Sequence, residues 1–169
     1  MFEKKPKKNA LSLTPSCPTY KGSREGKTLS IGVVASRYNP QIIKGLIEGC
    51  FKGLQACHVL QKNTVFVWVP GAFEIPLAVK QLTKHRHVDA VVCLGAVIRG
   101  ETAHFDHVAQ QAARGILDLN LELDIPVVFG VLTTDTLFQA QERSQDDEHN
   151  KGFEAALTAV EMATIFRET

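Results

Sequence analysis

The sequence lacks the motifs by which several common classes of binding and catalytic site are recognised. It holds no Gly-x-Gly-x-x-Gly segment, no complete Gly-x-x-x-x-Gly-Lys-Ser/Thr loop and no Gly-x-Ser-x-Gly elbow. Each of these motifs brings backbone N–H groups or a nucleophile to a strand-to-helix turn. Their absence argues against classical dinucleotide binding, nucleoside-triphosphate binding and serine-hydrolase chemistry.

Long hydrophobic runs and paired cysteines are also missing. No segment approaches the roughly 18 consecutive apolar residues of a membrane span, and the start MFEKKPKKN has no apolar stretch of the secretory type. The four cysteines, at positions 17, 50, 57 and 93, show no Cys-x-x-Cys spacing. Three of them fall in apolar or helical patterns, which predicts buried free thiols in a reducing compartment. We therefore expect a cytoplasmic protein with no membrane partner.

Neither sign of charge dominates the chain, whose formal net charge is +1 over 169 residues. Residues 1–28 carry seven Lys/Arg and two Glu, which leaves 12 basic and 16 acidic side chains in the remainder. An acidic body argues against a nucleic-acid partner for the folded part. We predict a disordered basic tail over residues 1–27 and one domain over residues 28–169. The alternative role for the tail is a targeting signal or a nucleic-acid-binding patch within residues 4–8.

Apolar runs alternate with helical periodicity from residue 28 onward. Strands are predicted at residues 29–35, 64–69, 90–98 and 126–132. Helices are predicted from residue 40, over 73–84 and 105–123, from a cap at 134–135 to about 143, and over 152–167. Asn39 and Pro40 supply the expected N-cap and first-turn proline of the first helix. This alternation predicts an α/β fold with a parallel sheet covered on both faces.

In such a sheet, ligands bind at the carboxyl ends of the strands. The segments expected there are residues 36–39, 70–74, 99–104 and 133–134. They bring two aromatic residues, a carboxylate and a histidine to one edge, which suits a flat, polar ring and a phosphorylated substrate. Tyr38 and Phe73 could instead fill the core.

The segment from residue 95 to residue 104 predicts an anion site beside a proton carrier. A buried strand runs into a turn with Gly100 and Thr102, and His104 follows at the expected start of a helix. Backbone N–H groups at such a helix start favour an anion. Thr102 could alternatively serve only as a helix cap. A metal site at His104 and His107 is disfavoured, because a strong site needs three or four ligands.

Five segments in combination resemble lumazine synthases. They are SRYN (36–39), VPGAFEIP (69–76), LGAVIRGETAHFD (94–106), FGVLTT (129–134) and ER (142–143). The resemblance runs from about residue 28 to the C-terminus, and it implies a flavodoxin-like three-layer sandwich with a four-stranded parallel sheet. It also implies condensation of 5-amino-6-(D-ribitylamino)uracil with 3,4-dihydroxy-2-butanone 4-phosphate, which releases phosphate and water. This is the penultimate step of riboflavin biosynthesis and uses no metal or organic cofactor.

The resemblance assigns roles to residues at the strand ends. His104 would transfer protons, and histidine's intrinsic pKa of about 6.5 suits that role. The ring of Tyr38, beside Asn39, would stack on the pyrimidine, and Gly100 would belong to the phosphate seat. The other implied binding residues are Ala72, Phe73 and Glu74 for the ribityl chain, Val97 and Ile98 for the pyrimidine, Glu101 and Thr102 for the phosphate, and Phe129, Arg143 and Lys151 from a neighbouring subunit.

The family's assembly implies a homopentamer with active sites between subunits, with a 60-subunit shell and a riboflavin synthase partner as further expectations. Two departures stand out. Tyr38 adds a hydroxyl to a stacking ring that is usually Phe or Trp, and SQDDEH at 144–149 replaces a turn that contains glycine and lysine in shell-forming members. A non-catalytic flavin- or lumazine-binding protein and a shell scaffold are the competing hypotheses.

Overall fold

Four parallel strands form the centre of the protein. The structure, a computed structural model, describes residues 17–147 and 149–168. The strands lie in the order β2-β1-β3-β4. Their bounds are β1 Ile31–Ser36, β2 Thr64–Val69, β3 Ala90–Ile98 and β4 Val127–Thr134. The predicted α/β fold with a four-stranded parallel sheet is confirmed.

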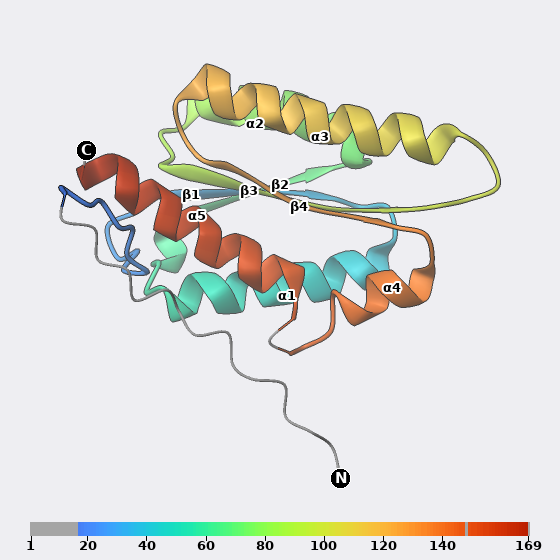
Figure 1. The fold of residues 1–169 in the computed structure, drawn as a ribbon, viewed down its shortest axis with the longest axis horizontal. Helices are drawn as coiled ribbons and strands as arrows, with labels where there is room; N and C mark the ends of the chain where they lie inside the picture. The colour runs from blue at the N-terminus through green and yellow to red at the C-terminus, as the bar shows by residue number, and fades with distance from the viewer. Residues whose placement is uncertain (1–16, 148, 169) are drawn as a thin grey trace, which may run out of the picture.

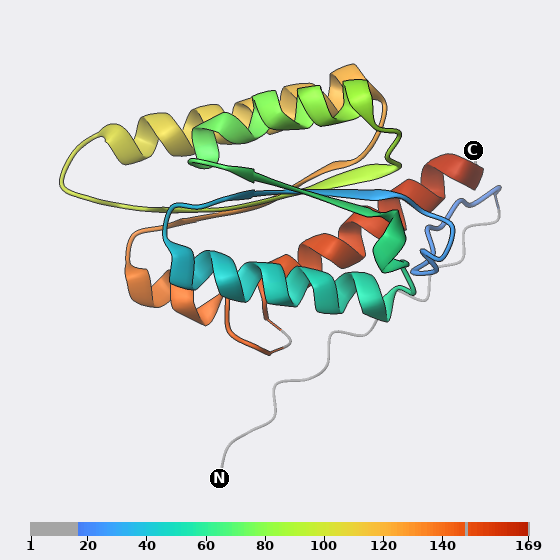
Figure 2. The same ribbon diagram turned by 180° about the vertical axis from the view of Figure 1, so that it is seen from behind.

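Helices cover both faces of this sheet and complete three layers (Figure 1). One face carries α1 (Pro40–Ala56), α4 (Leu137–Glu142) and α5 (Lys151–Glu168), and the other carries α2 (Ile75–His85) and α3 (His104–Leu123). Figure 2 shows the same division from behind. Each face has its own apolar cluster, so alternate residues of β1 and β3 contribute to opposite layers.

The position of the site follows from the strand order. β1 pairs with β2 on one side and with β3 on the other, so the chain passes from β1 outward to β2 and then back across the sheet. Connections that leave β1 and β3 therefore diverge to opposite faces. A crevice opens between them at the carboxyl ends of the strands.

Asn39 lies at the predicted N-cap position with Pro40 in the first turn of α1, but it does not cap by its side chain, and the cap predicted at residues 134–135 is wrong. The φ of Asn39 is 60°, and its side chain makes no cap hydrogen bond. Its amide instead donates to the carbonyl of Ala96 on β3 at 2.9 Å. β4 continues to Thr134, and the cap of α4 is Thr136, in a capping box with Gln139. The Asn39 side chain thus connects the loop before α1 to β3, a contact that the local sequence does not reveal.

The described part of the N-terminal segment lies beside the C-terminal end of α5 (Figure 1). The hydroxyl of Thr164 accepts from the Ser23 N–H at 2.8 Å and lies 3.0 Å from the Ser23 carbonyl. The Gly26 N–H donates to the Cys57 carbonyl at 2.6 Å. Residues 1–16 lie outside the described residues, and the boundary at residue 28 stays a prediction.

The cysteines are free, and Cys50, Cys57 and Cys93 are buried as predicted. Cys17 is exposed. Burial raises the pKa of the Cys50 thiol to about 12 and raises that of Cys93 as well. Within residues 17–147 and 149–168, no helix has the length and apolar character needed to cross a membrane.

Candidate active site

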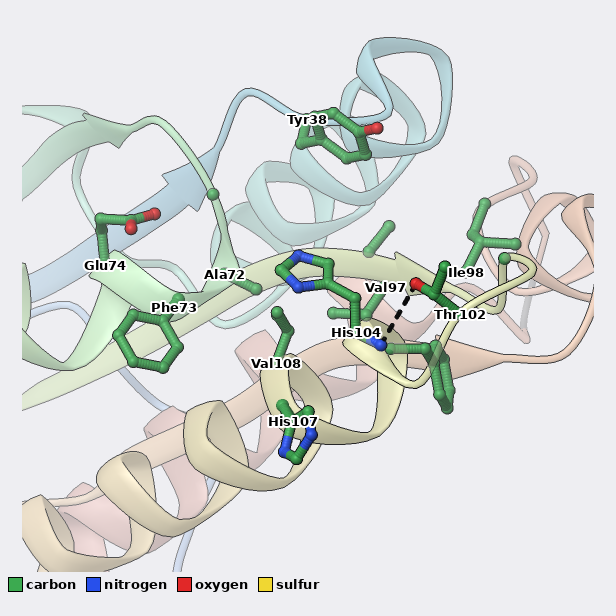
Figure 3. A pocket seen from close by; sticks show the side chains of 14 residues that line it. Tyr38, Ala72, Phe73, Glu74, Val97, Ile98, Thr102, His104, His107 and Val108 are labelled. Carbon is green, nitrogen blue, oxygen red and sulfur yellow. Dashed lines mark hydrogen bonds between the residues drawn. The ribbon is translucent and has the colours of Figure 1, made fainter.

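A cavity of about 660 Å³ lies at the carboxyl ends of the strands, where the strand order places a crevice. Five segments contribute to it: the loop after β1, the 3-10 helix η2 (Ala72–Glu74), the end of β3, the turn that follows β3, and the start of α3. Nine predicted site residues line it: Tyr38, Ala72, Phe73, Glu74, Val97, Ile98, Gly100, Thr102 and His104. Figure 3 labels the side chains of all of these except Gly100 around one opening.

Both aromatic residues predicted for the site are exposed rather than buried in the core. The exposed fractions are 71% for Tyr38 and 58% for Phe73. Exposing a ring forgoes the favourable free energy of burying it, so two such rings at one opening mark a binding surface. The left-handed backbone of Asn39 holds Tyr38 at the turn before α1. The alternative that these rings fill the core is wrong.

Glu74 supplies an unused hydrogen-bond acceptor. It ends η2, immediately before α2, and its side chain is exposed at the rim of the cavity. Among the described residues, its carboxylate has no hydrogen-bond or ion-pair partner. A free carboxylate beside an exposed ring can accept hydrogen bonds from the hydroxyls of a polar ligand.

The turn between β3 and α3 forms the anion-binding part of the cavity. α3 begins at His104, and the preceding Ala103 offers no side-chain cap. The Thr102 hydroxyl accepts from the His104 N–H at 3.4 Å (Figure 3). A β-carbon added at Gly100 would meet no atom within 4 Å. Open space above the start of a 20-residue helix whose N-cap residue has no capping side chain suits a phosphate.

His104 and His107 present their rings to the cavity from one face of α3. Val108 joins them at the same face, as residues three and four apart do on a helix. Sequence reasoning did not assign His107 to the binding site, although this spacing was the available signal. In the described ranges, no three His, Cys, Asp or Glu side chains are arranged to hold a metal ion.

Three predicted site residues lie elsewhere in the same chain. Phe129, Arg143 and Lys151 line a second cavity, of about 410 Å³, beside β4 and α5. The Arg143 guanidinium donates to the carbonyl of Gln139 at 2.9 Å, and Lys151 forms an ion pair with Glu154 at 2.6 Å. One chain therefore carries two separate groups of predicted site residues.

Two remaining predicted residues adjoin the first cavity without lining it. Glu101 is exposed in the turn between Gly100 and Thr102, and the Asn39 amide is held by Ala96. The side chains that line the first cavity include no Lys and no Arg. Both predicted cations, at Arg143 and Lys151, belong to the second cavity.

The sequence matches the 6,7-dimethyl-8-ribityllumazine synthase family over residues 28–167. The chain belongs to this family. A relative of that name from Protochlamydia amoebophila is 52% identical over 146 residues, which cover 86% of this chain and 85% of the relative. Another from Clostridium kluyveri is 44% identical over 149 residues, covering 88% of this chain and 97% of the relative. The match to the lumazine synthase family spans both cavities.

Proposed function

We propose that this lumazine synthase family member condenses 5-amino-6-(D-ribitylamino)uracil with 3,4-dihydroxy-2-butanone 4-phosphate to form 6,7-dimethyl-8-ribityllumazine, a transferase reaction of riboflavin biosynthesis. Phosphate and water leave. The observation that carries the proposal is the cavity at the strand ends. It combines exposed rings, a free carboxylate, a helix start whose N-cap residue has no capping side chain, and a histidine at one opening.

The pyrimidine substrate occupies the side of the cavity near Tyr38. Its ring stacks on Tyr38 above the apolar surface of Val97 and Ile98. The ribityl hydroxyls donate to Glu74, and Ala72 and Phe73 border the same chain. Asn39 contributes without contacting the substrate, because its hydrogen bond to the Ala96 carbonyl fixes the backbone next to Tyr38. The tyrosine hydroxyl adds one polar contact without removing the ring face.

The phosphorylated substrate occupies the turn before α3. Backbone N–H groups of Gly100 and Glu101 and the hydroxyl of Thr102 surround its phosphate. The amine attacks the ketone, the imine loses phosphate and the ring closes, so protons move at every stage. His104, beside this turn, transfers them. Holding both substrates in register contributes up to roughly 7–11 kcal/mol in favourable systems.

A neighbouring subunit completes the site. A phosphate dianion calls for a cation, yet the first cavity has no Lys or Arg in its lining, whereas Arg143 lies in the second. In the proposed assembly, the second cavity of one subunit covers the first cavity of the next. Arg143 then binds phosphate bidentately, Phe129 closes the pocket and Lys151 lies near the pyrimidine.

The proposed assembly is a homopentamer in the cytoplasm. Exposed apolar side chains on several elements provide surface for contacts between copies. They include Trp68 on β2, Leu77 on α2, Leu117 and Leu121 on α3, and Phe138 on α4. Size-exclusion chromatography distinguishes a free pentamer from a 60-subunit shell and detects any complex with riboflavin synthase. The 144–149 turn departs from that of shell-forming members.

Product formation tests the proposal. Purified protein is mixed with both substrates, and lumazine absorbance is followed against a reaction without enzyme, because the condensation proceeds slowly unaided. We expect acceleration that Arg143→Ala largely removes when the phosphorylated substrate is below saturation. A folded pentamer that gives no acceleration would favour the alternative of a flavin- or lumazine-binding or scaffold protein.

A further inference from the structure

Arg99 makes more side-chain contacts than any predicted site residue, although it does not line either cavity. Its guanidinium lies 3.0 Å and 3.2 Å from the two carboxylate oxygens of Asp106. Its Nε donates to Asp135 at 2.8 Å. The guanidinium carbon also lies 4.1 Å from the ring centre of Phe105, a cation–π distance.

These contacts connect the two ends of the turn that holds the proposed phosphate site. Arg99 is the residue after β3, and Asp106 is in the first turn of α3, so their bidentate pair closes the segment 100–105. The Arg99 N–H also donates to the Thr134 carbonyl at 2.9 Å and continues the pairing of β3 with β4. The side chains of residues 100–104 are exposed, so burial does not fix this turn.

The contact between Arg99 and Asp135 extends toward the second cavity. Asp135 follows β4, and its N–H donates to the Gln139 side-chain oxygen at 2.9 Å. The Gln139 carbonyl in turn accepts from the Arg143 guanidinium. Arg99 therefore contacts both the start of α3 and the segment that leads to α4 and Arg143.

We infer that Arg99 is a positioning residue for the phosphate-binding turn, and that it acts through Asp106 and Asp135 rather than by contacting phosphate. The inference rests on the proposed function. Two carboxylates and one aromatic ring already surround the guanidinium, so the local charge is net negative and repels an anion. The hydrogen bonds that Arg99 donates to Asp106 and Asp135 raise its pKa, which keeps the guanidinium charged.

The two possible roles of Arg99 predict opposite results for Asp106→Asn. If Arg99 positions the turn, weakening its partner loosens the turn, and phosphate binding weakens. If Arg99 instead binds phosphate directly, removing a competing carboxylate frees the guanidinium, and phosphate binding tightens.

The test measures inorganic phosphate binding as competitive inhibition, together with kcat and KM for both substrates. We expect Arg99→Lys and Asp106→Asn each to raise the phosphate inhibition constant and the KM for the phosphorylated substrate about three- to tenfold, with the KM for the pyrimidine nearly unchanged. The double variant should bind phosphate no more weakly than the single variant with the larger loss, because both substitutions break the Arg99–Asp106 pair. Arg114→Lys is the matched control, since the Arg114 Nε donates to the two carboxylate oxygens of Asp118 farther along α3.

Tighter phosphate binding in Asp106→Asn would overturn the inference. So would Arg99 variants that behave like Arg114→Lys, or additive effects in the double variant. A wild-type protein that neither forms lumazine nor binds phosphate would refute the proposed function instead. Hydrogen exchange across residues 100–106 gives a second readout, which should be faster in Arg99→Lys than in Arg114→Lys.

Discussion

The buried side chain of Asn150 occupies the space that a β-carbon at Gly49 would need. Its amide donates to the carbonyls of Gly45 and Gln145 at 3.0 Å and 2.8 Å, while its oxygen accepts from the N–H groups of Gly152 and Phe153. Asn150 thus caps α5 and joins it to α1. The absence of a side chain at Gly49 allows both roles.

Gly49→Ala should destabilise the protein. Alanine favours a helix over glycine by about 1 kcal/mol, but here the added carbon would displace an amide fixed by four hydrogen bonds. Overpacking costs about 1–3 kcal/mol, and lost hydrogen bonds add to it, so we expect a net loss of about 1–3 kcal/mol in the free energy of unfolding.

Urea unfolding measures this effect, with Gly100→Ala as the control. Gly100 has open space around it, so its substitution should change stability by less than about 0.5 kcal/mol. Equal stability of the two variants would contradict the account of Gly49.

The sequence predicted the strands to within two residues because they are near-continuous apolar runs. β2 and β3 have the predicted bounds. Prediction failed where a side chain uses a distant partner: the Asn39 amide binds Ala96, 57 positions away, instead of capping α1. The separation of Arg143 from the first cavity and the contacts of Arg99 likewise depend on the arrangement of β3, β4 and α3 in space. Periodicity carries no information about them.

Asn120 should contribute more to stability than its partly buried position in α3 suggests. Its amide donates to the Val127 carbonyl at 2.6 Å, and its oxygen accepts from the Val127 N–H at 2.8 Å. Through these two hydrogen bonds, a side chain of α3 satisfies the backbone polar groups at the start of β4, which is an edge strand. Asn120→Leu removes both hydrogen bonds and leaves the Val127 N–H and carbonyl without this partner, so we expect a loss of about 1–3 kcal/mol in the free energy of unfolding.

Thermal or urea unfolding of Asn120→Leu checks this expectation against Asn63→Leu as the control. The structure gives the Asn63 side chain no hydrogen bond among the described residues; only its backbone is used. A control loss as large as that of Asn120→Leu would show that the Val127 contacts are not the cause.

The buried thiols should make stability fall at alkaline pH. In the folded protein, burial raises the pKa of Cys50 to about 12 from an ordinary 9.0, whereas the unfolded thiol ionises near its ordinary value. Between about 9 and 12 the folded state holds the proton more tightly, so rising pH favours unfolding. Cys50→Ala should flatten this part of the stability profile, after allowance for its own packing loss.

A colorimetric thiol reagent at pH 8 distinguishes the exposed cysteine from the buried ones. Cys17 is exposed and should react at once, whereas Cys50 and Cys93 should react only on unfolding. Rapid reaction of every thiol in the native protein would contradict the burial of Cys50 and Cys93.

Mixed pentamers test directly whether two subunits share each site. His104→Ala should slow turnover by about a hundredfold yet leave activity, because proton transfer supplies roughly 10²–10⁴-fold in typical enzymes and substrate positioning persists. Arg143→Ala should mainly raise the KM for the phosphorylated substrate, by about ten- to a hundredfold, through loss of a charged hydrogen-bond pair.

If His104 of one subunit meets Arg143 of the next, co-assembly of the two variants restores intact sites. Random mixing in equal amounts places an unaltered His104 beside an unaltered neighbouring Arg143 at about a quarter of the sites. Activity at low phosphorylated-substrate concentration should therefore rise to about a quarter of the wild-type value, far above either variant alone. Assembly of each variant separately, followed by mixing without subunit exchange, is the control. Because a site within one chain would always lack one of the two side chains, co-assembled pentamers no more active than this control would place His104 and Arg143 in the same subunit's site.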